Sequence, residues 1–482
     1  MKEKIDIVLV KPGARMELFG KLGVSLSGIA PPLDIGLAAS FLRDKGYSVR
    51  IIDADAEYLT PSQAVDRIIE YQPIVAGIFA HTIRMMHAGQ IVKELKNKAP
   101  AIKTLLGGRH PSSLPEKTLI EEKPDFVCQG EPFYPLLELL KLLKTQPVPQ
   151  DYNINGIWYF KGNKAVSNPP HPLIKNLDEL PFIAWDLLPM NKYRAHNWHC
   201  FDNSKDRQPY AIIYTSIGCP YKCTYCCVNA VYGGSGIRFR SPEKVVEEID
   251  ILVRNYKVKN IRIVDDIFTF KPERVEKICD FIIERNYDLN FWCYARLDTV
   301  NETMLIKMKR AGINWISYGI EAGHEKVREG VFKRLNSDTI KKAVEMTKKV
   351  GIHIIANFVF GLPDDDIETV RATLDVAKEF NFEYVNFYVA MAWPGSKLYE
   401  ESVKNKIRLP DKWDGYAQLS EETLPLPTKS LTAEEVLRFR DKAFKEYFTN
   451  PEYLRMMEHK FGSDVRNGIQ GMLKYTINRK YA

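Results

Sequence analysis

The residues from Thr215 to Asn229 read T-S-I-G-C-P-Y-K-C-T-Y-C-C-V-N. They place Cys219, Cys223 and Cys226 in a C-x3-C-x2-C spacing. The apolar, β-branched run 210–215 leads into these cysteines and predicts a strand. The thiols are therefore expected on a loop at the carboxyl end of a strand, where α/β folds place their chemistry.

Three soft thiolates at this spacing favour either zinc or an iron–sulfur cluster. A structural zinc site needs four ligands, usually with a second cysteine pair at a distance, and the sequence holds no second C-x2-C pair. Three ligands would instead leave one iron of a 4Fe–4S cluster open to a small molecule. The alternative is a non-catalytic module that binds zinc through Cys219, Cys223 and Cys226.

Tyr225, between the second and third cysteines, completes a pattern that resembles the signature of the radical S-adenosylmethionine (SAM) superfamily. The resemblance implies that Cys219, Cys223 and Cys226 hold a 4Fe–4S cluster whose open iron chelates the amino and carboxylate groups of SAM. The reduced cluster would then cleave SAM to a 5′-deoxyadenosyl radical. Cys227 is expected to be a buried neighbour of the cluster rather than a ligand.

Composition indicates an ordinary globular protein. The 482 residues are enough for two or three domains, and 45% are hydrophobic and 27% charged. Eight cysteines, three of them in a metal-like spacing, do not suggest a disulfide framework, so a reducing cytoplasm is expected. No signal peptide or membrane-spanning run of about 20 apolar residues is evident. The net charge of +7 is spread widely and favours a solvated surface over a specific anionic partner.

Residues 1–145 alternate between strand and helix patterns, which predicts a doubly wound parallel sheet. Its ligands are expected at the carboxyl ends of the strands. The loops at those ends contain glycines, which allow the backbone to approach a large ligand closely. The expected strands are 5–10, 49–53, 74–79, 104–107 and 126–129.

The segment P-P-L-D-I-G-L-A-A-S-F-L-R-D-K-G-Y and the G-G-R-H-P and Q-G-E turns resemble the cobalamin-binding domain that precedes many radical SAM cores. This implies that cobalamin lies beside Gly107, Gly108, Gly130 and Glu131. No Asp-x-His-x-x-Gly loop supplies a lower cobalt ligand. The open candidates for that ligand are His81, His87 and His110, and the alternative is a domain that binds no corrinoid.

Residues 146–209 are expected to form a connector that contains a hairpin at 156–163. A second strand–helix alternation occupies 210–392 and predicts a partial, six-stranded parallel barrel. Charged residues follow successive strands of this barrel, which suggests one shared polar site. These residues are Asp265, Asp266, Arg296, Asp298 and Glu321.

Nearly the whole chain resembles the cobalamin-dependent radical SAM branch that contains class B methyltransferases and the anaerobic magnesium-protoporphyrin ester cyclase. The resemblance implies that Asp265 and Asp266 lie near the SAM amino group and the cluster. It places Arg296 and Glu321 near the SAM ribose or methionyl part. It also implies that Arg334, in V-F-K-R-L-N, pairs with the SAM carboxylate, which a bidentate guanidinium suits. The alternative for Arg334 is an exposed helix-capping residue.

Residues 393–482 form a C-terminal extension, with an amphipathic helix expected at 433–448. No RNA-binding β-barrel pattern follows, so no nucleic acid is expected. The resemblance implies C-methylation of an unactivated carbon in a small-molecule substrate, with methylcobalamin as the methyl donor. It also implies an electron donor such as flavodoxin or ferredoxin. The enzymatic alternative is cyclisation, oxidation or rearrangement without methyl transfer.

Overall fold

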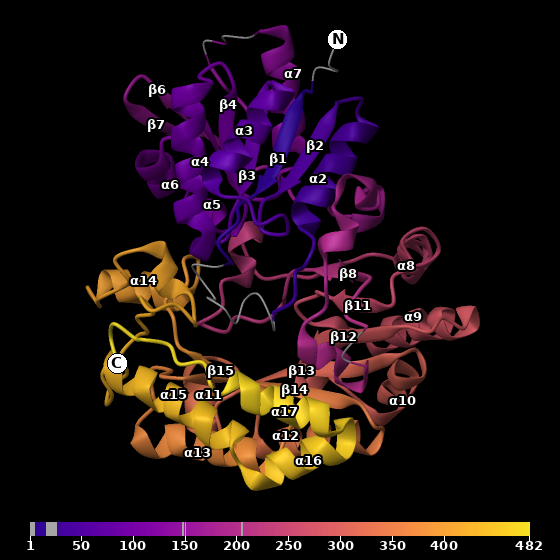
Figure 1. The fold of residues 1–482 in the computed structure, drawn as a ribbon. Helices are drawn as coiled ribbons and strands as arrows, with labels where there is room; N and C mark the ends of the chain where they lie inside the picture. The colour runs from indigo at the N-terminus through magenta and orange to yellow at the C-terminus, as the bar shows by residue number, and fades with distance from the viewer. Residues whose placement is uncertain (1–4, 16–26, 147–148, 150, 204–205) are drawn as a thin grey trace.

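The structure is a computed structural model, and it describes residues 5–15, 27–146, 149, 151–203 and 206–482. Two sheets form the centres of two stacked domains, with the N-terminal domain above the second sheet in Figure 1. The C-terminal helices, in yellow, cover the outer edge of the second sheet. None of the helices in the described ranges is long and apolar enough to cross a membrane.

The first sheet has the strand order β2-β1-β3-β4-β5-β6-β7. Its first five strands are parallel, and this confirms the predicted doubly wound arrangement. The strands are β1 (Ile7–Lys11), β2 (Val49–Asp53), β3 (Val75–Phe79), β4 (Lys103–Gly107), β5 (Phe126–Cys128), β6 (Ile157–Lys161) and β7 (Lys164–Ser167). The helices of this domain are α2 (Leu33–Asp44), α3 (Pro61–Tyr71), α4 (Met85–Lys98), α5 (Arg109–Ser113), α6 (Pro115–Glu122) and α7 (Phe133–Thr145).

The hairpin expected in the connector is present as β6 and β7. It pairs antiparallel with β5, so the first sheet extends past residue 145. The short helices α5 and α6 are additions to the sequence prediction. Helix α6 begins with Pro115 in its first turn and ends at Lys123 in the left-handed conformation, and both are ordinary boundary signals for a helix.

The second sheet has the order β15-β14-β13-β12-β11-β8, and all six strands are parallel. This confirms the predicted partial barrel. The strands are β8 (Tyr210–Ile213), β11 (Asn260–Ile263), β12 (Asn290–Ala295), β13 (Ile313–Glu321), β14 (His353–Phe360) and β15 (Tyr384–Val389). The intervening helices are α8 (Pro242–Tyr256), α9 (Pro272–Arg285), α10 (Glu302–Arg310), α11 (Glu325–Gly330), α12 (Ser337–Lys349) and α13 (Ile367–Phe380).

The C-terminal extension contains the predicted helix 433–448 as α15 (Ala433–Phe448), preceded by α14 (Lys397–Lys404). Two further helices, α16 (Pro451–Phe461) and α17 (Ser463–Met472), follow it. The Tyr447 hydroxyl donates to Phe382 O at 2.7 Å, and Arg440 Nε donates to Phe387 O at 2.8 Å. These bonds fix α15 along β15, the last strand of the barrel.

Candidate active site between the two sheets

Residues from both domains line one cavity of about 590 Å³. Parallel strands end at one edge of a sheet, so the loops that follow them gather there. The first domain contributes His81, Thr82 and Arg109, which follow β3 and β4. The second domain contributes Cys219, Cys223, Tyr225, Cys226, Cys227, Asp266, Arg296, Glu321 and Lys333.

The cysteine loop is bracketed by the short antiparallel strands β9 (Ser216–Ile217) and β10 (Arg238–Phe239). Gly218 has a φ of +92°, and a Cβ atom there would lie 2.4 Å from Gly236 O. Only glycine fits this close crossing of two backbone segments.

Asp265 does not line the cavity. It binds the residues at the start of the cysteine loop instead. Its carboxylate accepts hydrogen bonds from the Thr215 N–H and hydroxyl, both at 2.5 Å, and from the Ser216 hydroxyl at 2.6 Å. Asp265 is buried. A buried carboxylate with three donors has an anchoring role here, so of the two predicted aspartates only Asp266 reaches the cavity.

The donor set fits the predicted cluster. Cys219 and Cys223 are half-buried, and Cys226 is exposed to the cavity. In the part of the chain that the structure describes, no three His, Cys, Asp or Glu side chains converge on one metal ion. A 4Fe–4S cluster does not require this, because each thiolate binds a different iron. Cys227 is half-buried and lines the cavity too, so it is less buried than the sequence suggested.

Desolvation by the surrounding loop raises the pKa of the half-buried Cys219 thiol to about 11 and that of Cys226, although its side chain is open to the cavity, to about 12. Iron binds the thiolate form, so cluster assembly releases these protons. The raised pKa values therefore favour the protonated thiols of Cys219 and Cys226 until iron replaces the protons.

Glu321 and Lys333 form a buried ion pair in the cavity wall, with Nζ 2.8 Å from Oε1. Glu321 has a φ of +70°, a left-handed conformation that turns the chain at the end of β13. The Tyr225 hydroxyl lies close enough to the same carboxylate to be affected by its charge. Burial and the Glu321 charge raise the pKa of Tyr225 well above its ordinary value, so the phenol stays neutral. Lys333 is a site residue that sequence reasoning missed.

Arg296 also lines the cavity and is held rigidly. Its Nε and Nη2 atoms bind the two Asp298 carboxylate oxygens, each at 2.9 Å. Nη2 also donates to Lys333 O at 3.0 Å. The guanidinium lies 3.8 Å from the centroid of the Tyr221 ring. These contacts orient the planar group and compensate its charge.

Arg334 is exposed and does not line this cavity. Its guanidinium lies 5.6 Å from the centroid of the Phe332 ring. The neighbouring Lys333 points into the cavity instead. Pairing of Arg334 with a SAM carboxylate therefore stays a prediction from the family resemblance.

The first domain places the positive charge of Arg109 beside the cysteines. Burial opposes the charge of Arg109, but the acidic groups of Cys227 and Asp266 raise its pKa. Burial raises the pKa of Asp266 to about 6, although Arg109 acts to lower it. His81 is exposed to the cavity, yet desolvation by the surrounding protein and the nearby cations, Arg109 foremost, lower its pKa to about 3, so its imidazole is neutral. A neutral imidazole is able to bind a metal.

The other predicted cobalamin contacts lie outside the shared cavity. Gly108 has a φ of +100°, and a Cβ there would lie 2.9 Å from Ala80 O. Gly107 packs against the Phe79 ring, and the Gly130 N–H donates to Ser112 Oγ at 3.0 Å. Glu131 is 2.6 Å from Arg238 Nη2 and accepts from Ile174 N at 3.0 Å. It therefore joins the first domain to β10.

The two other candidate cobalt ligands are placed differently from His81. His110 is buried, with Nδ1 3.2 Å from Thr82 Oγ1 and its ring centroid 4.4 Å from that of Trp413. His87 lies within α4 and is not in the cavity lining. Of the three histidines, His81 alone lines the cavity that holds the cysteines.

Comparison with known proteins agrees with this geometry. A radical SAM superfamily model matches residues 213–377, and a B12 binding domain model matches residues 21–140. The chain belongs to the family of cobalamin-binding radical SAM enzymes. It is 31% identical to an uncharacterized methyltransferase of Pyrococcus horikoshii, over 98% of each chain.

A second relative, the anaerobic magnesium-protoporphyrin IX monomethyl ester cyclase of Rubrivivax gelatinosus, is 26% identical over 94% of this chain and 80% of its own. The fold is similar to that of the cobalamin-dependent S-adenosylmethionine radical enzyme OxsB, solved with aqua-cobalamin and S-adenosylmethionine bound. That match has a TM-score of 0.71 and 17% identity, and it covers 98% of this chain and 72% of OxsB. The cofactors of this family are a 4Fe–4S cluster, SAM and cobalamin.

Proposed function

We propose that this enzyme methylates an unactivated carbon of a small-molecule substrate. One observation carries the proposal: His81 and Arg109, at the edge of the cobalamin-binding sheet, line the same cavity as Cys219, Cys223 and Cys226. A methyl donor held by the first domain and a radical formed at the second would meet in this space.

The cavity residues divide into groups by their chemistry. Cys219, Cys223 and Cys226 would hold the cluster, leaving one iron for SAM. The fixed Arg296 and the Glu321–Lys333 pair would orient SAM, because groups whose positions are set before binding lose little on complex formation.

When bound, the cluster supplies an electron that cleaves SAM to a 5′-deoxyadenosyl radical, and cobalamin supplies the methyl group. The chain encloses this chemistry between two domains, which keeps water and side reactions away. The Glu131–Arg238 ion pair of 2.6 Å helps to hold the two domains together around the cavity.

The second candidate is radical cyclisation or oxidation without methyl transfer, favoured by the similarity to the Rubrivivax gelatinosus cyclase. It would use the same cofactors and consume one SAM for each turnover. The zinc-module alternative, which would bind one zinc and no cobalt, is disfavoured because both the radical SAM and the B12 binding domain models match this chain. We further propose a flavodoxin- or ferredoxin-like electron donor and a cytoplasmic location, since the cluster must be reduced and its thiols protected from oxidation.

Anaerobic reconstitution with iron, sulfide and cobalamin, followed by metal analysis, tests these candidates. The proposal expects about four irons and one cobalt per chain. Turnover with substrate should give both 5′-deoxyadenosine and S-adenosylhomocysteine. Formation of 5′-deoxyadenosine alone would support the cyclase-like candidate, and zinc alone would overturn both enzymatic ones.

A further inference from the structure

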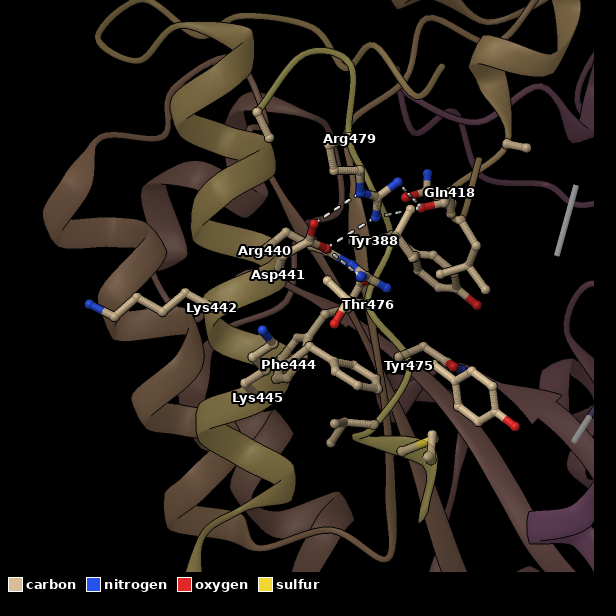
Figure 2. A pocket seen from close by; sticks show the side chains of 18 of the residues that line it. Tyr388, Gln418, Arg440, Asp441, Lys442, Phe444, Lys445, Tyr475, Thr476 and Arg479 are labelled. Carbon is tan, nitrogen blue, oxygen red and sulfur yellow. Dashed lines mark hydrogen bonds and ion pairs between the residues drawn. The ribbon is translucent and has the colours of Figure 1, made fainter. Parts of the chain in front are cut away.

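A second cavity of about 1200 Å³ lies between β15, α15 and the C-terminal segment 475–482. Figure 2 shows Tyr388, Gln418, Arg440 and Tyr475 around it. Ile83, Tyr388 and Trp393 line both this cavity and the active-site cavity. The two spaces are therefore adjacent, and Tyr388 and Trp393 stand between them.

The walls of the second cavity are rich in apolar and aromatic side chains. Tyr384 and Phe387 come from β15, Phe444 from α15, and Met472 from the end of α17. Large apolar walls with a few polar groups are typical of sites for organic ligands. The cavity is large enough for a substrate of substantial size.

Three charged side chains form a compact group in one wall. Arg479 binds the Asp441 carboxylate through Nε at 2.9 Å and Nη2 at 3.0 Å. Arg440 binds the same carboxylate through Nη1 at 2.7 Å. Figure 2 shows both guanidinium groups around the one carboxylate. Two positive charges therefore share one negative charge, and the group carries a net positive charge.

The two arginines differ in how fully they are bonded. Arg479 also donates to Gln418 O, Ser420 O and Thr423 Oγ1, at 2.8 to 3.2 Å. Arg440 donates through Nε to Phe387 O and through Nη1 to Asp441, and none of the described residues accepts a bond from its Nη2. The residue is 7% exposed. The Nη2 atom is not fully enclosed by protein, so its donors are available to an acceptor in the cavity.

The other charged side chains in this wall do not supply that acceptor. Glu446 lies 3.1 Å from Arg371 Nη1 and 3.1 Å from Lys378 Nζ, so it is already paired. Within the described ranges, neither Lys442 nor Lys445 makes an ion pair. The lining side chains therefore leave an excess of positive charge around a largely apolar space.

We infer that this second cavity is the substrate chamber, and that it takes an organic molecule with a large apolar body and an anionic group bound at Arg440. The anion is a carboxylate or a phosphate, since a guanidinium binds either through paired N–H donors. The inference rests on the proposed function, because the substrate's reacting carbon would reach the cysteine cavity past Tyr388 and Trp393.

Binding of 1-pyrenebutyrate and of its neutral analogue 1-pyrenebutanol tests the inference without turnover. Equilibrium dialysis against the reconstituted holoenzyme would measure both affinities. Arg440→Gln should weaken pyrenebutyrate binding about tenfold and change pyrenebutanol binding less than about twofold, since a charged hydrogen bond is lost. Arg466→Gln, which alters an arginine paired with Glu458 outside this cavity, should change neither.

Thr476→Trp, a change in the lining beside Arg440, should weaken binding of both probes by filling the cavity. Displacement of pyrenebutyrate by inorganic phosphate or by acetate, against chloride at equal ionic strength, would identify the preferred anion. Displacement by neither would overturn the inference, as would equal loss of both probes in Arg440→Gln. If Arg440→Gln does not fold, Arg440→Lys takes its place and should retain the preference for pyrenebutyrate over pyrenebutanol. A wild-type protein that shows no such preference would also overturn the inference.

These results are separable from the proposed function. Probe binding that depends on Arg440, together with an absence of methyl transfer, would contradict the proposed reaction and leave the chamber in place. Methyl transfer without Arg440-dependent probe binding would contradict the substrate chamber and leave the proposed reaction in place.

Discussion

Lys333 Nζ lies 2.8 Å from Glu321 Oε1, and this buried ion pair joins the end of β13 to the segment before α12 in the active-site wall. Lys333→Met would leave the Glu321 carboxylate buried without its cation. We expect a loss of about 3 kcal/mol in the free energy of unfolding, together with weaker SAM binding. Urea unfolding and equilibrium dialysis with SAM would measure the two effects.

Arg334→Met is the matched control for this change, because Arg334 is adjacent and exposed. Its effect on unfolding should stay within about 0.5 kcal/mol. If Arg334 pairs with the SAM carboxylate, as the family resemblance implies, SAM binding should weaken with no loss of stability. A large loss of stability in Arg334→Met would contradict the exposed placement.

The cluster ligands should be distinguishable from their neighbour. Cys226→Ala removes one of three proposed thiolate ligands, so we expect the reconstituted protein to lose most of its iron and all SAM cleavage. Cys227→Ala should keep about four irons per chain. Iron analysis with the visible absorption spectrum checks both. Full iron content in Cys226→Ala, or its loss in Cys227→Ala, would show that the ligand set is different.

Substitution of Gly108 tests whether its close contact with Ala80 positions the loops that follow β3 and β4. Gly108→Ala would force a Cβ to within 2.9 Å of Ala80 O at a φ of +100°. We expect a cost of about 2 kcal/mol in stability and a lower cobalt content, because the loop that carries Arg109 must shift away from the loop that carries His81.

Gly162→Ala provides the comparison for this prediction. Gly162 also has a positive φ, of +60°, but nothing lies within 4 Å of its added Cβ. The substitution should cost about 1 kcal/mol and leave the cobalt content unchanged. Equal effects of the two substitutions would show that the contact with Ala80 is unimportant.

Glu383 should make stability depend on pH. Burial opposes its charge, but His353, Lys460 and the Ile354 N–H lower its pKa from 4.5 to about 2. A carboxyl group whose pKa is lower in the folded protein stabilises the fold at pH values above its pKa in the unfolded chain. This stability is lost as the pH falls through its pKa in the folded protein. The contribution is about 3 kcal/mol at pH 7 and should fall by roughly half between pH 5 and pH 3.

Urea unfolding of the wild type and Glu383→Gln at several pH values would measure this contribution as a difference, so that other effects of acid cancel. The wild type should be more stable at pH 7, and the difference should narrow steadily below pH 5. A difference that stays constant down to pH 3 would mean that Glu383 does not titrate in this way.

Much of the fold followed from periodicity, because long apolar strands alternate with amphipathic helices. Strand β12 occupies 290–295, as predicted, and the cysteine loop follows β8 and the short strand β9. The short helices α5, α6, α11 and α14 and the final helices α16 and α17 were missed. The first four have only five to eight residues over which a period is visible, and packing against other elements stabilises them. Helices α16 and α17 have 11 and 10 residues, so their length does not explain why they were missed.

The site was harder to predict, because neighbouring residues on a chain point in different directions. Asp265 and Asp266 are adjacent, yet the first anchors Thr215 and the second faces the cavity. Lys333 and Arg334 are also adjacent, yet Lys333 lines the cavity and Arg334 is exposed outside it. Arg440 and Arg479 come together only through the packing of the C-terminal segment against α15, and no spacing in the sequence indicates that pairing.

Transfer of a labelled methyl group from SAM to the protein-bound corrinoid would test the proposed function most directly. It requires no knowledge of the substrate. The reconstituted, reduced protein would be incubated with SAM that carries a trideuterated methyl group, and the corrinoid and SAM products would be analysed by mass spectrometry. Methylation predicts a trideuterated methyl group on the corrinoid and an equal amount of S-adenosylhomocysteine. An unlabelled corrinoid, with 5′-deoxyadenosine and methionine as the only SAM products, would contradict it.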